Sequence, residues 1–160
     1  MQNVKKLKGS SRLILYAGTA KPSPKMGQSL GPLGLNMMQF CKEFNDLTGH
    51  YRTDVPLRIC LKAYIDRTFT FIIKPAPTSW YLKRCAMEET GTPFARRKWP
   101  GEIGIKYIYE IAKIKKEIDP NLKNTNLFGI CKMIAAQADA MGFEVVKDSL
   151  NAEPTLPKKI

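Results

Sequence analysis

The sequence predicts an α+β fold in two parts, a small α/β sandwich-like domain hinged to a bundle of three helices with one short strand. Residues 57–65 and 68–74 alternate apolar with polar side chains, which is the period of a strand. Beyond Pro75-Ala76-Pro77 the apolar residues recur every three or four positions, which is the period of a helix. The prolines interrupt both patterns and are typical of a semi-rigid hinge. We therefore expect an N-terminal domain at 1–74, a helical domain at 75–147 and a tail at 148–160.

The N-terminal domain is predicted to be a sheet that one helix covers. A strand over 11–17 comes first, and Asp66-Arg67 is the turn of a hairpin formed by the two later strands. The helix is expected over 36–48, with Asn36 as its N-cap and Gly49 as its stop. The residues predicted to face inward are Met37, Phe40, Cys41 and Phe44 on the helix, and Leu57, Ile59, Leu61, Ala63, Ile65, Phe69, Phe71 and Ile73 on the hairpin.

The helical domain is predicted from three apolar stripes. Thr78 is positioned to cap the first helix, and a polar, basic loop follows at 91–101. The second helix is expected over 105–116 and the third from its cap Asn126 to Gly142, before a short strand at 143–146. The inward residues are Leu82, Cys85 and Ala86, then Ile105, Ile108, Ile111 and Ala112, then Leu127, Ile130, Ile134, Ala138 and Met141.

The proline- and glycine-rich loop from Gly18 to Gly34 is too stiff for a slack linker. Long ordered loops are often functional. A phosphate cradle is one interpretation, but the spacing lacks both the Gly-Lys-Ser/Thr ending of a P-loop and the GxGxxG of a dinucleotide fold. A rigid surface turn beside a packing helix explains the glycines as well.

The charge balance favours a polyanionic partner. The chain carries 26 Lys+Arg against 14 Asp+Glu, a net charge of +12. Charge alone does not distinguish RNA from DNA or an acidic membrane. No apolar run approaches the roughly 20 residues of a membrane helix.

Composition also argues against catalytic or metal chemistry. Cys41, Cys60, Cys85 and Cys131 are scattered without a CxxC pair, and His50 is the single histidine. The pattern indicates free thiols in a reducing compartment. We expect no enzyme, no cofactor, no metal and no small-molecule substrate.

A family resemblance rests on several motifs in order. Residues 22–45 read P-S-P-x-M-G-x-x-L-G-x-x-G-x-N-x-M-x-F-C-K-x-F-N, and 63–71 read AYIDRTFTF. With the Pro75-Ala76-Pro77 hinge, Glu110-Ile111-Ala112, Met133-Ile134-Ala135 and Met141-Gly142, the chain resembles the universal large-subunit ribosomal protein eleven family, the stalk-base protein, over about residues 10–147.

The resemblance implies that the second domain binds large-subunit rRNA, with its third helix against a minor groove. The face of the third helix would include Asn126, Gly129, Lys132, Ala136 and Gln137, and Thr78 and Gly101 are expected to bind rRNA as well. Independently of the resemblance, a local concentration of positive charge predicts phosphate contacts from Lys83, Arg84, Arg96, Arg97 and Lys98. The alternative is that these side chains are ordinary solvated surface charges.

The chain departs from the family in two places. Gly101-Glu102-Ile103-Gly104 replaces a Gly-Lys-Val/Ile-Thr run, and Ala136-Gln137 with Asp139 replaces a Gly-Thr pair and an arginine. Cations are lost and acids gained, which favours a remodelled or shortened rRNA partner.

By resemblance the first domain faces the factor-binding side of the ribosome. Translational GTPases would dock there transiently, and acidic stalk proteins would be neighbours. The loop residues implied are Pro22, Ser23, Pro24, Lys25, Gly27, Gln28, Gly31 and Gly34. Structural rigidity is the competing explanation for this loop.

Two other function classes compete with the ribosomal one. The helical half suits a helix-turn-helix DNA-binding protein, although its third helix is poor in arginine. A nucleotide-dependent enzyme lacks the required motif. The basic start and the departures from the bacterial pattern favour a mitochondrial ribosome, with the bacterial cytoplasm as the alternative.

Overall fold

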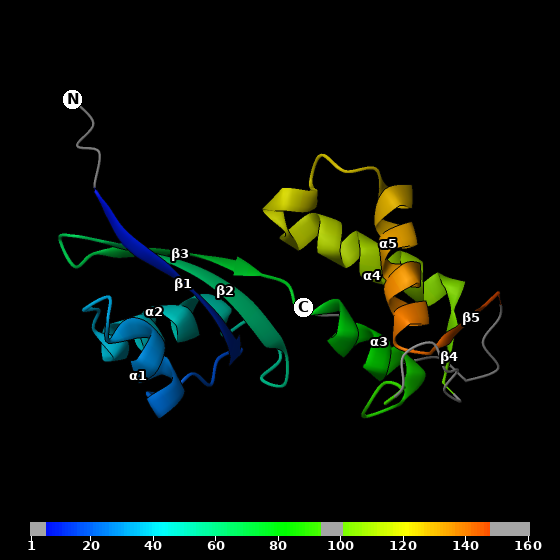
Figure 1. The fold of residues 1–160 in the computed structure, drawn as a ribbon, viewed down its shortest axis with the longest axis horizontal. Coiled ribbons are helices and arrows are strands. Elements are labelled where there is room, and N and C mark those ends of the chain that lie inside the picture. The colour runs from blue at the N-terminus through cyan, green and yellow to red at the C-terminus, as the bar shows by residue number, and fades with distance from the viewer. Residues whose placement is uncertain (1–5, 94–100, 148–160) are drawn as a thin grey trace. The chain divides into compact units, whose positions relative to one another are not determined.

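The computed structural model of the protein describes residues 6–93 and 101–147, and these divide into two units between Lys74 and Pro75 (Figure 1). The first unit contains β1 (Leu7–Tyr16), α1 (Pro24–Leu30), α2 (Met37–Thr48), β2 (Pro56–Tyr64) and β3 (Phe69–Lys74). The second contains α3 (Thr78–Ala86), β4 (Glu102–Gly104), α4 (Ile105–Ile118), the 3-10 turn η1 (Pro120–Leu122), α5 (Leu127–Ala140) and β5 (Glu144–Val146).

The first unit is an antiparallel sheet, β1-β2-β3, with both helices on one face (Figure 1). The register pairs Leu13 with Ile59 and Ile59 with Ile73, so like side chains share a face. The Phe40 ring of α2 meets Phe69 and Phe71 at centroid distances of 5.9 and 5.5 Å. The predicted sheet covered by a helix is therefore confirmed.

Local caps define α2 as predicted. The Asn36 Oδ1 accepts hydrogen bonds from the backbone N–H groups of Met38 and Gln39 at 3.0 and 3.4 Å, and Gly49 is the C-cap. Phe40, Cys41 and Phe44 are buried beneath the sheet. The cap residues and the buried apolar residues thus both support the predicted span of α2.

Three predictions for the first unit need correction. The loop after β1 is not wholly irregular, because it contains the seven-residue helix α1. The strand β1 begins at Leu7 rather than at residue 11. Ile65 does not face inward, since it follows the end of β2 and is 58% exposed.

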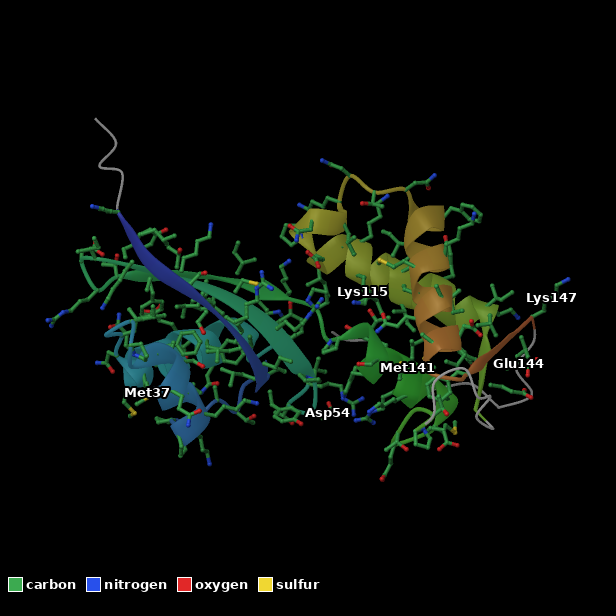
Figure 2. The ribbon with its side chains drawn as sticks, in the orientation of Figure 1. Met37, Asp54, Lys115, Met141, Glu144 and Lys147 are labelled. Carbon is green, nitrogen blue, oxygen red and sulfur yellow. The ribbon has the colours of Figure 1, made fainter. Side chains whose placement is uncertain are left out.

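The second unit packs three helices around a core of large apolar side chains. Tyr81 and Leu82 of α3, Ile111 of α4, and Ile130 and Ile134 of α5 are all buried. The Nζ of Lys115, a buried residue of α4, donates to the carbonyl oxygen of Ala76 at 3.4 Å and ties the start of this unit to its helices (Figure 2). The predicted three-helix bundle is confirmed.

The second unit also differs from expectation. The strand β4 was not predicted, and it pairs in parallel with β5 through Ile103 and Val145. The cap of α3 is Pro77, which makes no side-chain hydrogen bond, so the prediction of Thr78 as the cap is wrong. Ile105 is 48% exposed rather than inward, because it begins α4 directly after β4. No helix of the described ranges is long and apolar enough to cross a membrane.

Candidate RNA-binding interface

One face of α5 packs into the core of the second unit through the buried Ile130, Ile134 and Ala138. The exposed residues of the helix form its opposite side, here called the outer face. Asn126 caps the helix, its Oδ1 accepting a hydrogen bond from the Phe128 N–H at 3.2 Å. Of the residues implied by the resemblance, the structure brings together the exposed Asn126, Gly129, Lys132 and Ala136, and it places Gln137 half-buried at the edge.

Small residues on this face leave the helix backbone accessible, because no long side chain covers it. A Cβ built on Gly129 would meet only the Thr125 methyl carbon, at 3.9 Å, so packing within the chain does not require glycine there. Glycine inside a helix costs about 1 kcal/mol relative to alanine. The exposed Ala136 adds only a methyl group further along the helix. A bulky partner can therefore approach the α5 backbone closely.

An aromatic ring on this face was missed by sequence reasoning. Phe128 is 64% exposed, and the Lys132 Nζ lies 4.7 Å from the centre of its ring. The available signal was its position in the sequence, since Phe128 falls outside the apolar stripe formed by Ile130, Ile134 and Ala138.

The charges of α5 are divided along its length. Lys132 is its single cation and Asp139 its single acid, and both are exposed. Met141 and Glu144 lie just beyond, at the C-terminal end of α5 and on β5 (Figure 2). The N-terminal half of the helix is thus the half that suits a polyanion.

Three of the other predicted residues of the second unit, Thr78, Lys83 and Arg84, belong to α3. The guanidinium carbon of the exposed Arg84 lies 5.3 Å from the Trp80 ring, and Lys83 beside it is half-buried, in the last turn of α3. Thr78 is half-buried at the start of the same helix. Arg96, Arg97 and Lys98 lie outside the described residues.

Gly101 has a packing role rather than an exposed one. It is buried, and a Cβ at this position would lie 2.7 Å from the Phe143 ring and 3.3 Å from the Ala86 methyl group. Any side chain would therefore displace the buried Phe143. The position of Gly101 is explained by the fold, and the structure does not place it on the outer face of α5.

Cys41 and Cys85 are buried and are not activated as nucleophiles. Burial raises the pKa of the Cys85 thiol to about 11 and also raises the pKa of Cys41, so both are protonated near neutral pH. Within residues 6–93 and 101–147, no three His, Cys, Asp or Glu side chains are grouped as metal ligands would be.

Comparison with known protein families decides the affiliation. Residues 11–69 match the model of the ribosomal protein L11 N-terminal domain, and residues 74–145 match the model of the ribosomal protein L11 RNA binding domain. The chain belongs to the ribosomal protein L11 family. Its members are structural components of the ribosome rather than enzymes, as the sequence predicted.

A curated relative extends this result. The large ribosomal subunit protein uL11m of Schizosaccharomyces pombe is 38% identical over 135 residues, which cover 84% of this chain and 93% of that protein. The predicted family is confirmed by the two domain matches, and the predicted mitochondrial membership is confirmed by this likeness.

The proline-rich loop of this L11 family member is exposed and is held in place by a helix cap, buried side chains and hydrogen bonds to α2. Ser23 is the N-cap of α1, and the buried Met26 and Leu30 anchor the helix to the unit. Asn45 of α2 holds the preceding segment, because its Oδ1 accepts from the Ala20 N–H at 2.9 Å and its Nδ2 donates to the Ala20 carbonyl at 3.0 Å. The residues left exposed are Pro22, Ser23, Pro24, Lys25, Gln28, Gly31 and Gly34, and Gly27 is half-buried.

Two of the loop glycines are required by the fold. A Cβ on Gly31 would lie 2.6 Å from the Gly27 carbonyl oxygen, closer than any real side chain approaches. Gly34 has a φ of +72°, in the left-handed region that favours glycine. These glycines are therefore explained without a ligand, and they do not indicate a phosphate cradle.

Proposed function

We propose that this chain is a structural constituent of the large subunit of the mitochondrial ribosome, that its second unit binds large-subunit rRNA at the stalk base, and that its first unit helps dock translational GTPases. The main support for the proposal is that α5 exposes small residues and one lysine, in a domain that matches the L11 RNA binding domain. The mechanism is positional, since one unit anchors the chain and the other presents a surface.

The form of α5 supports RNA recognition by shape. The minor groove of an RNA helix is wide and shallow, so a helix with small residues can lie against its sugars and base edges. Gly129 and Ala136 provide the low surface, and Lys132 provides a cation for a phosphate. The exposed Asp139 marks the end of the helix that we expect to face away from phosphates.

The DNA-binding alternative is weaker on the same residues. A recognition helix reads the major groove through bidentate arginine, asparagine or glutamine side chains. The outer face of α5 carries no arginine, and its Gln137 is half-buried at the edge. Readout of duplex DNA is therefore not the chemistry that this helix favours.

Direct binding tests the RNA proposal. The full chain is titrated against the stalk-base segment of mitochondrial large-subunit rRNA, an unrelated folded RNA of equal length, and duplex DNA at one salt concentration. We expect the stalk-base segment to bind at least tenfold more tightly than either competitor. Equal affinity for the three would contradict specific rRNA recognition and leave only charge attraction.

The exposed loop supports the docking proposal. Pro24 begins α1 while Lys25 and Gln28 project from it, and a rigid surface loses little conformational entropy when a factor docks. We expect Lys25→Glu with Gln28→Glu to lower ribosome-stimulated GTP hydrolysis without changing rRNA affinity. Lys42→Glu, on the exposed side of α2, is the control for reversing one positive charge elsewhere in the same unit. Unchanged GTP hydrolysis in the double variant would contradict docking at this loop.

A further inference from the structure

Phe128 presents an aromatic ring to solvent in the first turn of α5. The residue is 64% exposed, whereas Ile130, Ile134 and Ala138 pack the helix onto its unit. The fold therefore does not require an aromatic ring at this position. Single exposed apolar residues are common on protein surfaces, so exposure alone carries no argument.

A cation accompanies the ring. The Lys132 Nζ lies 4.7 Å from the ring centre, and Lys132 makes no ion pair with any residue in the described ranges. The helix contains no carboxylate before Asp139. A flat apolar surface beside an uncompensated positive charge suits a ligand that is both planar and anionic.

The surface next to the ring is open. Gly129 follows Phe128, and a Cβ at Gly129 would touch nothing closer than 3.9 Å. No side chain stands at Gly129, so helix backbone is exposed at the residue that follows Phe128. The ring and the glycine both lie on the exposed side of the first turn of α5.

We propose that Phe128 and Lys132 form a stacking site for one unpaired base of the rRNA, with the base on the ring and Lys132 at a neighbouring phosphate. This proposal rests on the proposed function, because it names an interaction within the same α5 face. Proteins hold splayed-out RNA bases by stacking them on aromatic side chains, and a nearby cation neutralises the backbone. The site would let α5 recognise an unpaired nucleotide in addition to groove shape.

The chain contains a matched control on α4. Tyr109 is 45% exposed and the Lys113 Nζ lies 5.2 Å from its ring, which repeats the spacing of Phe128 and Lys132. Here, however, Lys113 pairs with the Glu110 Oε1 at 3.4 Å, so its charge is compensated. We expect the α4 pair to make no contribution to RNA affinity.

The test compares variants of the full chain binding the stalk-base rRNA segment over a range of salt concentrations. Phe128→Ala and Phe128→Leu should both weaken binding, by about 5- to 140-fold for removal of one base stack. Phe128→Trp should retain affinity because it keeps a ring. The slope of log affinity against log salt should stay unchanged in all three, whereas Lys132→Met should lower it by about 0.7–0.9. Tyr109→Ala should match the unmodified chain.

The outcomes separate this inference from the function on which it rests. If the unmodified chain does not prefer the stalk-base segment, the proposed function itself fails. If that preference holds but Phe128→Ala binds normally, the stacking site is wrong. If Phe128→Leu binds as tightly as Phe128→Trp, the interaction is apolar packing, as a protein neighbour would make, and not base stacking. Thermal unfolding of each variant confirms that the exposed substitutions leave the fold intact.

Discussion

The loop of the first unit and the outer face of α5 both expose glycines, but for different reasons. In the loop, Gly31 has no room for a Cβ beside the Gly27 carbonyl, and Gly34 adopts a positive φ. On α5, a Cβ at Gly129 would make only an ordinary van der Waals contact with the Thr125 methyl carbon, at 3.9 Å. Gly31 and Gly34 are therefore explained by folding, whereas Gly129 lowers the stability of its helix and no contact within the chain requires it. A glycine points to an external partner only where the fold does not require it.

The largest effect is expected when the two units are separated and assayed as fragments. We expect the fragment 75–147 to fold alone and bind stalk-base rRNA nearly as tightly as the full chain, because its core residues are self-contained. The fragment 1–74 should fold but show no preference for this RNA. Circular dichroism and RNA titration of both fragments provide the measurement. Specific binding by the fragment 1–74 would contradict this prediction, because the RNA interface would then lie in the first unit.

Replacing the basic residues Arg96, Arg97 and Lys98, which lie outside the described residues, is expected to have a smaller effect. Their joint replacement with alanine should weaken rRNA binding and lower the salt slope by about 0.7–0.9 for each phosphate that is no longer neutralised. The control is the same titration of Lys8→Ala. Lys8 is a cation of the first unit, and its Nζ donates a hydrogen bond to the Leu33 carbonyl oxygen. A slope that does not move in the triple variant would assign these three charges to solvent or to a protein neighbour.

The elements that the sequence predicted are those with local causes. The helix α2 has a cap, an apolar stripe and a stop within its own span, and the hairpin alternates regularly. By contrast, α1 is a seven-residue helix amid prolines and glycines, and it depends on burial of Met26 and Leu30. The strand β4 has three residues and exists through pairing with β5, which lies beyond both α4 and α5 in the sequence. Such elements are determined by tertiary contacts that periodicity does not record.

The residues of the candidate site also differ in whether local sequence or tertiary contacts determine their placement. Asn126, Gly129, Lys132 and Ala136 could be placed on one face because a helix fixes their relative directions. Phe128 was missed because an apolar residue beside a helix cap is ambiguous until its exposure is known. Gly101 was included by resemblance, and its packing against Phe143 is visible only when β4 and β5 are paired.

A substitution at Gly31 tests whether the fold of the first unit requires glycine at this position. Gly31→Ala should destabilise that unit by about 1–3 kcal/mol, because the new methyl group overlaps backbone rather than a movable side chain. Gly27→Ala, whose Cβ would meet only the Met37 sulfur at 3.9 Å, is the matched control. Denaturant unfolding measures the stability and RNA titration measures the affinity, which should not change. Equal stability of the two variants would contradict the packing explanation.

The central claim is that α5 meets RNA where its glycine leaves the backbone open. Its most direct measurement compares the unfolding free energy and the rRNA affinity of the full chain with Gly129→Ala and Gly129→Leu. We predict that neither substitution lowers stability, and that alanine raises it by about 0.5–1 kcal/mol, since both residues favour helix over glycine. Affinity for stalk-base rRNA should nevertheless fall, more for leucine than for alanine. Unchanged affinity in Gly129→Leu would contradict the account, because a bulky side chain would then sit at the proposed interface without effect.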